Sequence, residues 1–331
     1  MRRRHPLVIG HRGAPGYRPE HTRSSYALAL ALGVDAVEPD VVVSADGVLV
    51  VRHENEIGST TDVADRPEFA GRRATKTVDG ASTTGWFTED FTWAELATLR
   101  CRERLPHVRP SSAAFDGDEP PLRLRDVLDL VRTASIEQGR EIGVVVELKH
   151  ASLFTALGFD LAALVAAQLR ESGWDGDPSL VIESFEPTVL DRVRDDGIRA
   201  SFVFLLEAAG HPHDLGDDGP SYAWFASPAG LDALAGRMDG ISLDKRMILA
   251  PDRLGRATGP SRVVTDAHER GLRVYTWTCR PENMFLLPEF RRLGPKSAWG
   301  RYEDEWRIIA DAGVDGVFVD HPDLGVSLFR R

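Results

Sequence analysis

Residues 6–43 read PLVIGHRGAPGYRPEHTRSSYALALALGVDAVEPDVVV, and this stretch decides the fold. Apolar runs at 6–10 and 35–43 predict two strands. Between them, Thr22 is a candidate N-cap for a helix over 24–32, and the glycine that follows is a candidate stop for that helix. The order strand, helix, strand predicts a βαβ unit, whose two strands run parallel in one sheet.

The same pattern continues along the chain. Short apolar runs predict strands at 48–52, 142–148, 179–184, 200–206, 239–243, 273–277 and 315–319. Apolar residues at helical spacing predict helices at 124–131, 161–170, 187–195, 262–270 and 303–312. The Asp46-Gly47 pair predicts a tight hairpin turn. About eight strand–helix units in a chain of 331 residues predict an α/β fold, a (β/α)₈ TIM barrel, with a doubly wound open sheet as the alternative.

We expect residues 1–331 to form a single catalytic domain with two insertions. Residues 55–120, after the second strand region, are rich in Gly, Thr, Asp, Arg and Pro, and carry only weak helix signals at 62–70 and 92–99. A loop of this length is usually functional, so it is either a surface elaboration or a cap over the barrel mouth. A smaller insertion is expected at 281–302.

Composition and charge narrow the functional class. A chain of 331 residues with 42% hydrophobic content can bury one large core. The net charge of -11 argues against a nucleic-acid partner but allows a small phosphate-bearing substrate, because a local cation can outweigh the negative net charge of the chain.

The basic residues 1–4 are not followed by the apolar segment of a signal peptide, and no stretch is long enough to span a membrane. With only Cys101 and Cys279 present, we expect a cytoplasmic protein without stable membrane insertion.

Acidic residues gather at the ends of predicted strands. Glu38 and Asp40 point to the same side of their strand, as do Glu147 and Lys149, and His11 follows the first strand. Catalytic groups of a barrel lie at these carboxyl ends. Converging carboxylates repel each other unless they are protonated, paired or bound to a metal, and oxygen ligands favour Mg²⁺ or Ca²⁺. Each residue alone also fits a loop anchor or a solvated ion pair.

Three motifs together resemble the glycerophosphodiester phosphodiesterase family: HRGAPGYRPEHT (11–22), DAVEPDVVVSADGVLVVRHE (35–54) and VVELKH (145–150). Similar segments occur at 182–185, 274–278 and 313–322, so that the resemblance runs from residue 7 to about 325. The long insertion resembles that of the bacterial branch that acts on small glycerophosphodiesters. Two residues depart from the family pattern. His21 replaces a common Asn and could alter substrate positioning, and Glu54 replaces a common Asp and could shift a supporting hydrogen bond.

The resemblance implies hydrolysis of glycerophosphodiesters to sn-glycerol 3-phosphate and an alcohol. It implies that Glu38, Asp40 and Glu147 hold one divalent cation, while His11 and His53 act as an acid–base pair. Histidine suits proton transfer near neutral pH, and we predict His11 as the base and His53 as the acid. The nucleophile is either water or the neighbouring glycerol hydroxyl of the substrate, which would give a cyclic phosphate.

Substrate binding calls for cations and a small apolar wall. Arg12 offers a planar fork of N–H groups to the phosphate, and Lys149 offers a point charge. Phe185 and Trp277 are candidates for a wall against the glycerol carbons, with barrel core as the alternative. Further candidates are Ser184, Asp244 and Lys245.

Two other functions use the same residues. One keeps the site and changes the substrate to a lysophospholipid, a phosphoinositide or a glycerol-phosphate polymer. A lipid-acting form would expose apolar residues near the mouth, such as 284–287, which we expect instead to be a buried helix turn. The other is a noncatalytic barrel that binds polyol phosphates, which would require the loss of an acid–base group or metal ligand, whereas competent residues occupy all of those positions.

Overall fold

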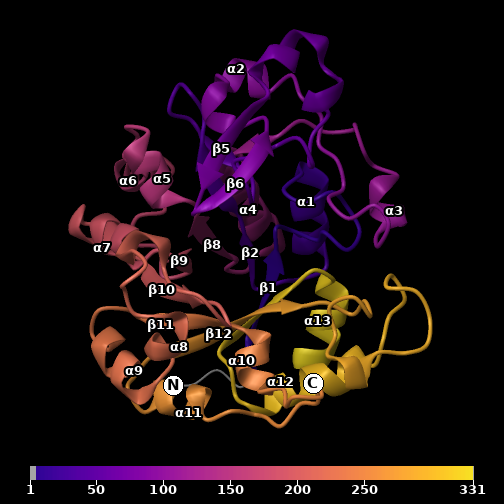
Figure 1. Cartoon of the computed structure of the whole chain (residues 1–331), viewed down its shortest axis with the longest axis vertical. Helices are drawn as coiled ribbons and strands as arrows, with labels where there is room; N and C mark the ends of the chain where they lie inside the picture. Colours follow the sequence, from indigo (N-terminus) through magenta and orange to yellow (C-terminus); the bar gives the residue numbers. More distant parts are fainter. Residues whose placement is uncertain (1–4, 331) are drawn as a thin grey trace.

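Parallel strands close into a barrel in this computed structural model, which describes residues 5–330 (Figure 1). The basic residues 1–4 lie outside the described residues. The barrel strands are β1 (Leu7–His11), β2 (Ala36–Glu38) with its continuation β3 (Asp40–Val43), β8 (Gly143–Leu148), β9 (Leu180–Ser184), β10 (Ser201–Leu206), β11 (Gly240–Asp244), β12 (Arg273–Cys279) and β13 (Gly316–Val319). Because β2 pairs with both β1 and β8, the ring closes, and the predicted (β/α)₈ barrel is confirmed in place of the open sheet.

The second predicted strand is interrupted at Pro39, which separates β2 from β3. Proline has no N–H to donate to a sheet ladder, and a break at this position is the expected result. Beyond the break, β3 pairs in parallel with β8 and antiparallel with β4 (Leu49–Val51), which pairs in turn with β7 (Leu122–Arg123). The hairpin predicted at Asp46-Gly47 is therefore present.

Helices pack around the barrel between successive strands (Figure 1). They are α1 (Arg23–Ala31), α4 (Leu124–Gln138), α5 (Ala151–Ala156), α6 (Leu161–Glu171), α7 (Pro187–Asp195), α8 (Tyr222–Phe225), α9 (Pro228–Leu234), α10 (Lys245–Leu249), α11 (Val263–His268), α12 (Tyr302–Asp311) and α13 (Pro322–Phe329). The predicted N-cap is present, since the Thr22 side chain accepts a hydrogen bond from the backbone N–H of Ser25 at 3.2 Å. Within residues 5–330, no helix combines the length and the apolar character needed to cross a bilayer.

The long insertion folds into small elements of its own. They are the 3₁₀ helices Val63–Asp65, Pro67–Arg72 and Thr88–Asp90, the hairpin β5 (Ala74–Val78) and β6 (Ala81–Gly85), and the helices α2 (Trp93–Leu96) and α3 (Pro110–Ala113). The helix α2 with β5 and β6 lies in the upper part of Figure 1, whereas α3 lies at the right. The hairpin escaped prediction because its strands are short, polar and mostly exposed. The helix signal at 92–99 was correct, and Thr92 and Glu95 form a capping box there.

The smaller insertion, 281–302, contains one short 3₁₀ helix, Pro288–Phe290, among its described residues. Within the segment 284–287, Leu286 and Leu287 are buried whereas Met284 is exposed. The expected burial therefore holds for the second half of this segment, but the backbone there is a turn and not a helix.

Two layers of side chains fill the barrel interior. The lower layer is apolar and consists of Ile9, Ala36, Val145, Val181, Val203, Tyr275 and Phe318. Residues two positions further along a strand face the same side, so they form the next layer toward the carboxyl ends. That layer consists of His11, Glu38, Glu147, Glu183, Leu205, Trp277 and Asp320. The apolar layer thus lies beneath a mostly polar layer at the carboxyl ends of the strands.

Candidate active site

A cavity of about 810 Å³ opens at the carboxyl ends of the barrel strands. Most of the predicted site residues line it, namely His11, Arg12, Glu38, His53, Glu147, Lys149, Phe185 and Trp277, together with Ser184. Asp40 is fully buried and contacts two of these lining residues, Arg12 and Lys149. Asp244 and Lys245 are not among the residues that line the cavity.

His11 is held by a carboxylate on the neighbouring strand. Its Nδ1 lies 2.7 Å from Oδ1 of Asp320, which follows β13. Burial, with a contribution from the charge of Arg12, lowers the pKa of His11 to about 4. The imidazole is therefore neutral at pH 7, donates its Nδ1 proton to Asp320 and leaves Nε2 as the nitrogen that can accept a proton.

His53 follows β4 and is also held in a neutral form. Its Nδ1 lies 2.6 Å from Oε1 of Glu54, and its Nε2 accepts a hydrogen bond from Nζ of Lys149 at 3.2 Å. Burial and the charges of Arg12 and Lys149 hold the pKa of His53 well below its usual range. Oε2 of Glu54 lies 3.4 Å from Nε2 of His150. The Glu54 carboxylate thus contacts both His53 and His150.

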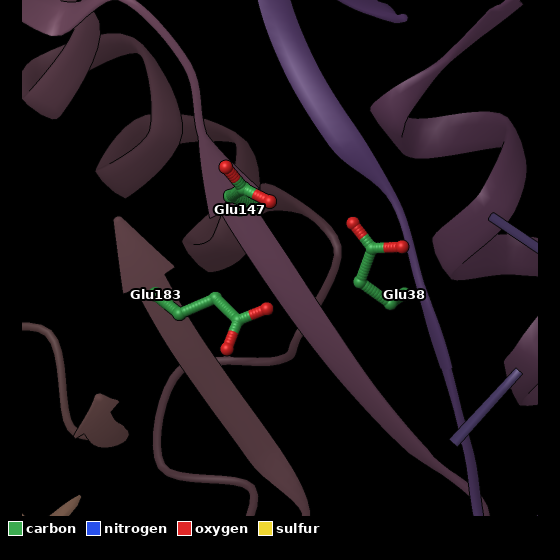
Figure 2. A group of neighbouring side chains, drawn as sticks. All are labelled: Glu38, Glu147 and Glu183. Carbon is green, nitrogen blue, oxygen red and sulfur yellow. The ribbon is translucent and has the colours of Figure 1, made fainter. Parts of the chain in front are cut away.

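Three glutamates from neighbouring strands converge on one point, as Figure 2 shows. Glu38, Glu147 and Glu183 each offer an oxygen within 4.8 Å of the others. Oε1 of Glu38 and Oε2 of Glu183 are buried and have no hydrogen-bond partner among residues 5–330. Burial, with repulsion from nearby carboxylates, raises the pKa of Glu147 to about 8 and holds the pKa values of Glu38 and Glu183 well above their usual range. Such a site favours protons or a cation.

Asp40 lies beside this trio and is already paired. Its Oδ2 lies 2.8 Å from Nε2 of His21 and 3.2 Å from Nε of Arg12. Burial opposes its ionisation, but the charges of Arg12 and Lys149 and the hydrogen bond with His21 outweigh that effect and hold the pKa of Asp40 well below its usual range. Oδ1 of Asp40 has no hydrogen-bond partner in the described part of the chain. Its assignment as a metal ligand stays a prediction.

The departure at His21 does not place a titratable group in the cavity. His21 is fully buried, and its Nδ1 lies 2.7 Å from Oη of Tyr26 while its Nε2 faces Asp40. His21 therefore contacts a carboxylate beside the site, and an effect on substrate positioning stays a prediction.

The turn after β1 depends on a glycine. Arg12 has φ +57° and Gly13 has φ +93°, and a Cβ on Gly13 would lie 2.6 Å from Ser25. This turn brings the backbone N–H of Arg12 within 2.8 Å of Oε2 of Glu38. The Arg12 side chain is engaged as well, since its Nη1 donates to Glu20 at 3.0 Å.

The long insertion supplies part of the cavity wall, through Asp79, Gly80, Glu103, Arg104, Leu105 and Arg109. Arg109 donates hydrogen bonds to Oδ2 of Asp320 at 2.6 Å and to Oε1 of Glu282 at 2.8 Å. Arg280, the residue directly after β12, donates from Nε to Oδ2 of Asp320 at 2.6 Å. The insertion is thus bonded to the carboxylate that holds His11, and it forms part of the site instead of a remote surface elaboration.

Aromatic rings form part of the cavity wall. The ring of Phe185 packs edge-on against Trp277, with centroids 5.5 Å apart, and against Tyr222, with centroids 6.2 Å apart. Nζ of Lys149 lies 5.4 Å from the centre of the Phe185 ring. Phe185 and Trp277 are only half-buried and line the cavity, so that neither is simply part of the barrel core.

Sequence reasoning missed Glu183 and Asp320, although a signal for both existed. Each follows a residue of the barrel interior, Val181 or Phe318, by two positions on a predicted strand, and the alternation of strand side chains therefore places it at the mouth. Arg109 had no comparable signal, because it lies in an insertion whose path only the fold reveals.

Comparison with known proteins shows the family of this chain. The model of the glycerophosphoryl diester phosphodiesterase family matches residues 11–324. Glycerophosphodiester phosphodiesterase GDPD6 of Arabidopsis thaliana is 31% identical over 328 residues, covering 95% of this chain and 83% of its own. A solved structure from Silicibacter pomeroyi, assigned as a glycerophosphoryl diester phosphodiesterase, has a TM-score of 0.70 at 24% identity and covers 99% of this chain and 95% of its own.

A phosphodiesterase of Oleispira antarctica, solved in complex with the product sn-glycerol-3-phosphate, has a TM-score of 0.64 at 19% identity and covers 99% of this chain and 98% of its own. At these identities, the two structural neighbours support the fold alone. The family match over nearly the whole chain, together with the relative above 30% identity, identifies this protein as an enzyme of the glycerophosphoryl diester phosphodiesterase family.

Proposed function

We propose that this enzyme hydrolyses small glycerophosphodiesters to sn-glycerol 3-phosphate and an alcohol. The observation that carries the proposal is the convergence of two neutral imidazoles and a buried carboxylate trio on one cavity. The Oleispira antarctica phosphodiesterase, which shares this fold, was solved in complex with the product sn-glycerol-3-phosphate.

One divalent cation, Mg²⁺ or Ca²⁺, fits the carboxylates. Glu38 and Glu147 would hold it with Asp40, and Glu183 faces the same point as a further donor. Unpartnered buried oxygens on Glu38, Asp40 and Glu183 support this assignment, because buried carboxylates without a partner are costly. The cation would supply Lewis-acid stabilisation of charge on a phosphate oxygen.

His11 would act as the base and His53 as the acid. Nε2 of His11 can accept a proton from the nucleophile, while Asp320 stabilises the imidazolium that forms. His53 must carry a proton to donate it to the departing alcohol. The negative charge of a bound phosphodiester favours the protonated form of His53, since an adjacent anion raises the pKa of an imidazole. Either water or the neighbouring glycerol hydroxyl serves as the nucleophile in this arrangement.

Binding of the substrate would use the cations and rings of the cavity. Lys149 and Arg12 would contact the phosphate, both already held in place by carboxylates. Phe185 and Trp277 would pack against the glycerol carbons.

We also propose that residues 1–331 work as one catalytic domain in the cytoplasm. Hydrogen bonds from Arg109 to Asp320 and Glu282 join the long insertion to the barrel and to the smaller insertion. Cys101 and Cys279 are both buried and unpaired, which agrees with a reducing compartment.

The test is the release of glycerol 3-phosphate from glycerophosphoglycerol by the purified chain, with and without Mg²⁺ or Ca²⁺. We expect metal-dependent turnover. A purified, folded chain that releases no glycerol 3-phosphate with either metal would refute the proposal.

A further inference from the structure

The hairpin of the long insertion reaches the cavity through its turn. Val78 at the end of β5 pairs with Ala81 at the start of β6, so that Asp79 and Gly80 alone form the turn between the strands. Their φ angles are +46° and +78°, as a two-residue type I′ turn requires, and Asp-Gly is a favoured sequence for this turn. Both residues line the cavity. The turn therefore presents a carboxylate to the cavity.

This carboxylate is paired with a histidine of the barrel. Oδ2 of Asp79 lies 2.6 Å from Nδ1 of His150, and this is the one ion pair that Asp79 makes among residues 5–330. His150 follows Lys149 in the loop after β8, and its φ of +52° is a conformation that non-glycine residues seldom adopt. The side chain of His150 is nearly buried. A residue of the insertion and a residue of the barrel thus meet at the cavity wall.

The second ring nitrogen of His150 faces another carboxylate. Its Nε2 lies 3.4 Å from Oε2 of Glu54, and Oε1 of Glu54 lies 2.6 Å from Nδ1 of His53. Asp79, His150, Glu54 and His53 therefore form a row in which carboxylates and imidazoles alternate. The row runs from the turn of the insertion to the histidine proposed as the acid.

His150 is positively charged within this row. Burial opposes the charge, but the hydrogen bonds with Asp79 and Glu54 outweigh burial and raise the pKa of His150 to about 9. Both nitrogens of an imidazolium donate, so that His150 can hold a carboxylate on each side. The side chain of Glu54 is 44% exposed, and its only other ion-pair partner in the described part of the chain is His53. His150 is therefore the group that can fix Glu54 independently of His53.

The position of Glu54 matters for proton donation by His53. When the P–O bond to the departing alcohol breaks, the oxygen of that alcohol takes the proton from Nε2 of His53, while Nδ1 stays bonded to Glu54. A carboxylate on Nδ1 orients the ring and stabilises its protonated form before the transfer. A displacement of about 1 Å in a reacting group can cost roughly a hundredfold in rate. Groups that fix Glu54 thus influence the rate through His53.

We propose that Asp79 and His150 are positioning residues for this proton transfer: Asp79 fixes His150, His150 fixes Glu54, and Glu54 aims His53 at the departing alcohol. In this way a turn of the long insertion assists chemistry on the barrel. This inference rests on the proposed function and adds two residues to it.

The test compares two diesters of glycerol 3-phosphate that differ in their need for an acid. Glycerophosphoglycerol releases an alkoxide, which must be protonated, whereas the p-nitrophenyl diester releases p-nitrophenolate, a stable anion. A defect in the acid should therefore lower kcat for glycerophosphoglycerol and spare the p-nitrophenyl diester. His53→Ala gives the reference pattern, in which the loss for glycerophosphoglycerol exceeds the loss for the p-nitrophenyl diester by roughly tenfold or more.

Two conservative variants test the row itself. Asp79→Asn removes the charge and keeps the turn, because Asn-Gly also favours type I′. His150→Asn tolerates the positive φ and is too short to bridge two carboxylates. For glycerophosphoglycerol, we expect kcat to fall by roughly tenfold in His150→Asn and by roughly two- to fivefold in Asp79→Asn, with KM within about twofold. For the p-nitrophenyl diester, kcat should stay within about twofold in both variants.

The double variant tests the order of the row. Because Asp79 acts only through His150, the variant with both substitutions should retain the kcat of His150→Asn, whereas independent effects would multiply. Asp118→Asn is the matched control, since Asp118 is exposed, lies in the same insertion and makes no ion pair within the described residues. It should change kcat for neither substrate. Thermal unfolding of each variant shows whether it is folded.

An equal loss for both substrates in folded His150→Asn would overturn the inference, because it would indicate a role in substrate binding or in general structure. Unchanged kcat for glycerophosphoglycerol in that variant, or effects that multiply in the double variant, would overturn it as well. These three results leave the proposed function intact. An equal loss for both substrates in His53→Ala would instead refute His53 as the acid, and no turnover of any diester by the unmodified chain would refute the proposed function; the inference falls with either.

Discussion

Nδ1 of His11 lies 2.7 Å from Oδ1 of Asp320, across the pair of adjacent strands β1 and β13. The other oxygen of Asp320 accepts hydrogen bonds from Arg109 and Arg280, each at 2.6 Å. Because these two arginines hold the carboxylate, it can rotate only by breaking their bonds. The orientation and tautomer of His11 are therefore set by a residue more than three hundred positions away in the chain.

The first prediction concerns this pair. Asp320→Asn keeps the shape of the side chain but removes its charge and allows the amide nitrogen to face Nδ1, which favours the wrong tautomer of His11. We expect kcat to fall by roughly two to four orders of magnitude, with a smaller change in KM. Steady-state release of glycerol 3-phosphate measures both parameters, and thermal unfolding shows whether the variant is folded. A folded variant with kcat within a few-fold of the unmodified enzyme would exclude a positioning role for Asp320.

The second prediction concerns proton transfer. His11→Ala and His53→Ala should each lower turnover by roughly two to four orders of magnitude while the protein stays folded. His268→Ala is the matched control, because His268 pairs with Asp315 at 2.8 Å, where β13 begins, at the opposite end of the barrel. Its turnover should be unchanged. Near-normal activity in either of the first two variants would remove that histidine from the mechanism.

The third prediction concerns the metal. Chelation by EDTA should stop turnover, and Mg²⁺ or Ca²⁺ should restore it. Glu38→Gln, Asp40→Asn and Glu183→Gln should each raise the metal concentration that gives half-maximal activity by about tenfold or more, the scale of effect expected when a metal contact is lost. An unchanged metal requirement in Glu183→Gln would leave Glu38, Asp40 and Glu147 as the ligand set. Full activity in EDTA would contradict the whole scheme.

The barrel was predictable from sequence because its information is local. Apolar runs, helical spacing and the cap at Thr22 depend on residues close together in the chain, and nearly every predicted strand and helix is present within a few residues. The break at Pro39 and the hairpin within the insertion were not anticipated. The break follows from the N–H group that Pro39 lacks. The hairpin strands are polar, so no apolar pattern marks them in the sequence.

The site was predictable only in part. Strand alternation brings Glu38 and Glu147 together as expected, and the same rule, if applied to the later strands, also places Glu183 and Asp320 at the mouth. The contribution of Arg109 depends on how an insertion folds back over the barrel. No local pattern encodes that path, because it follows from packing between distant segments.

Acid should destabilise the fold through a buried histidine outside the catalytic pair, His321. His321 follows Asp320 and lies between Tyr17 and Trp299, with ring centroids 4.9 Å and 5.3 Å away. Burial, only partly offset by the charge of Glu282 and reinforced by that of Arg109, lowers the pKa of His321 to about 4. In the unfolded chain the pKa of a histidine is about 6.5, so below that pH the unfolded chain binds more protons than the native state.

The contribution of His321 to the free energy of unfolding is on the order of 3 kcal/mol. It is fully present above pH 6.5 and is lost as the pH falls through 4. We expect His321→Gln to lose less stability than the unmodified protein between pH 7 and about pH 4. Urea unfolding at a series of pH values measures the difference between the two slopes. The exposed His107, replaced by Gln, serves as the control and should reproduce the unmodified profile. Parallel slopes for the unmodified protein and His321→Gln would show that the buried imidazole is not what limits stability in acid.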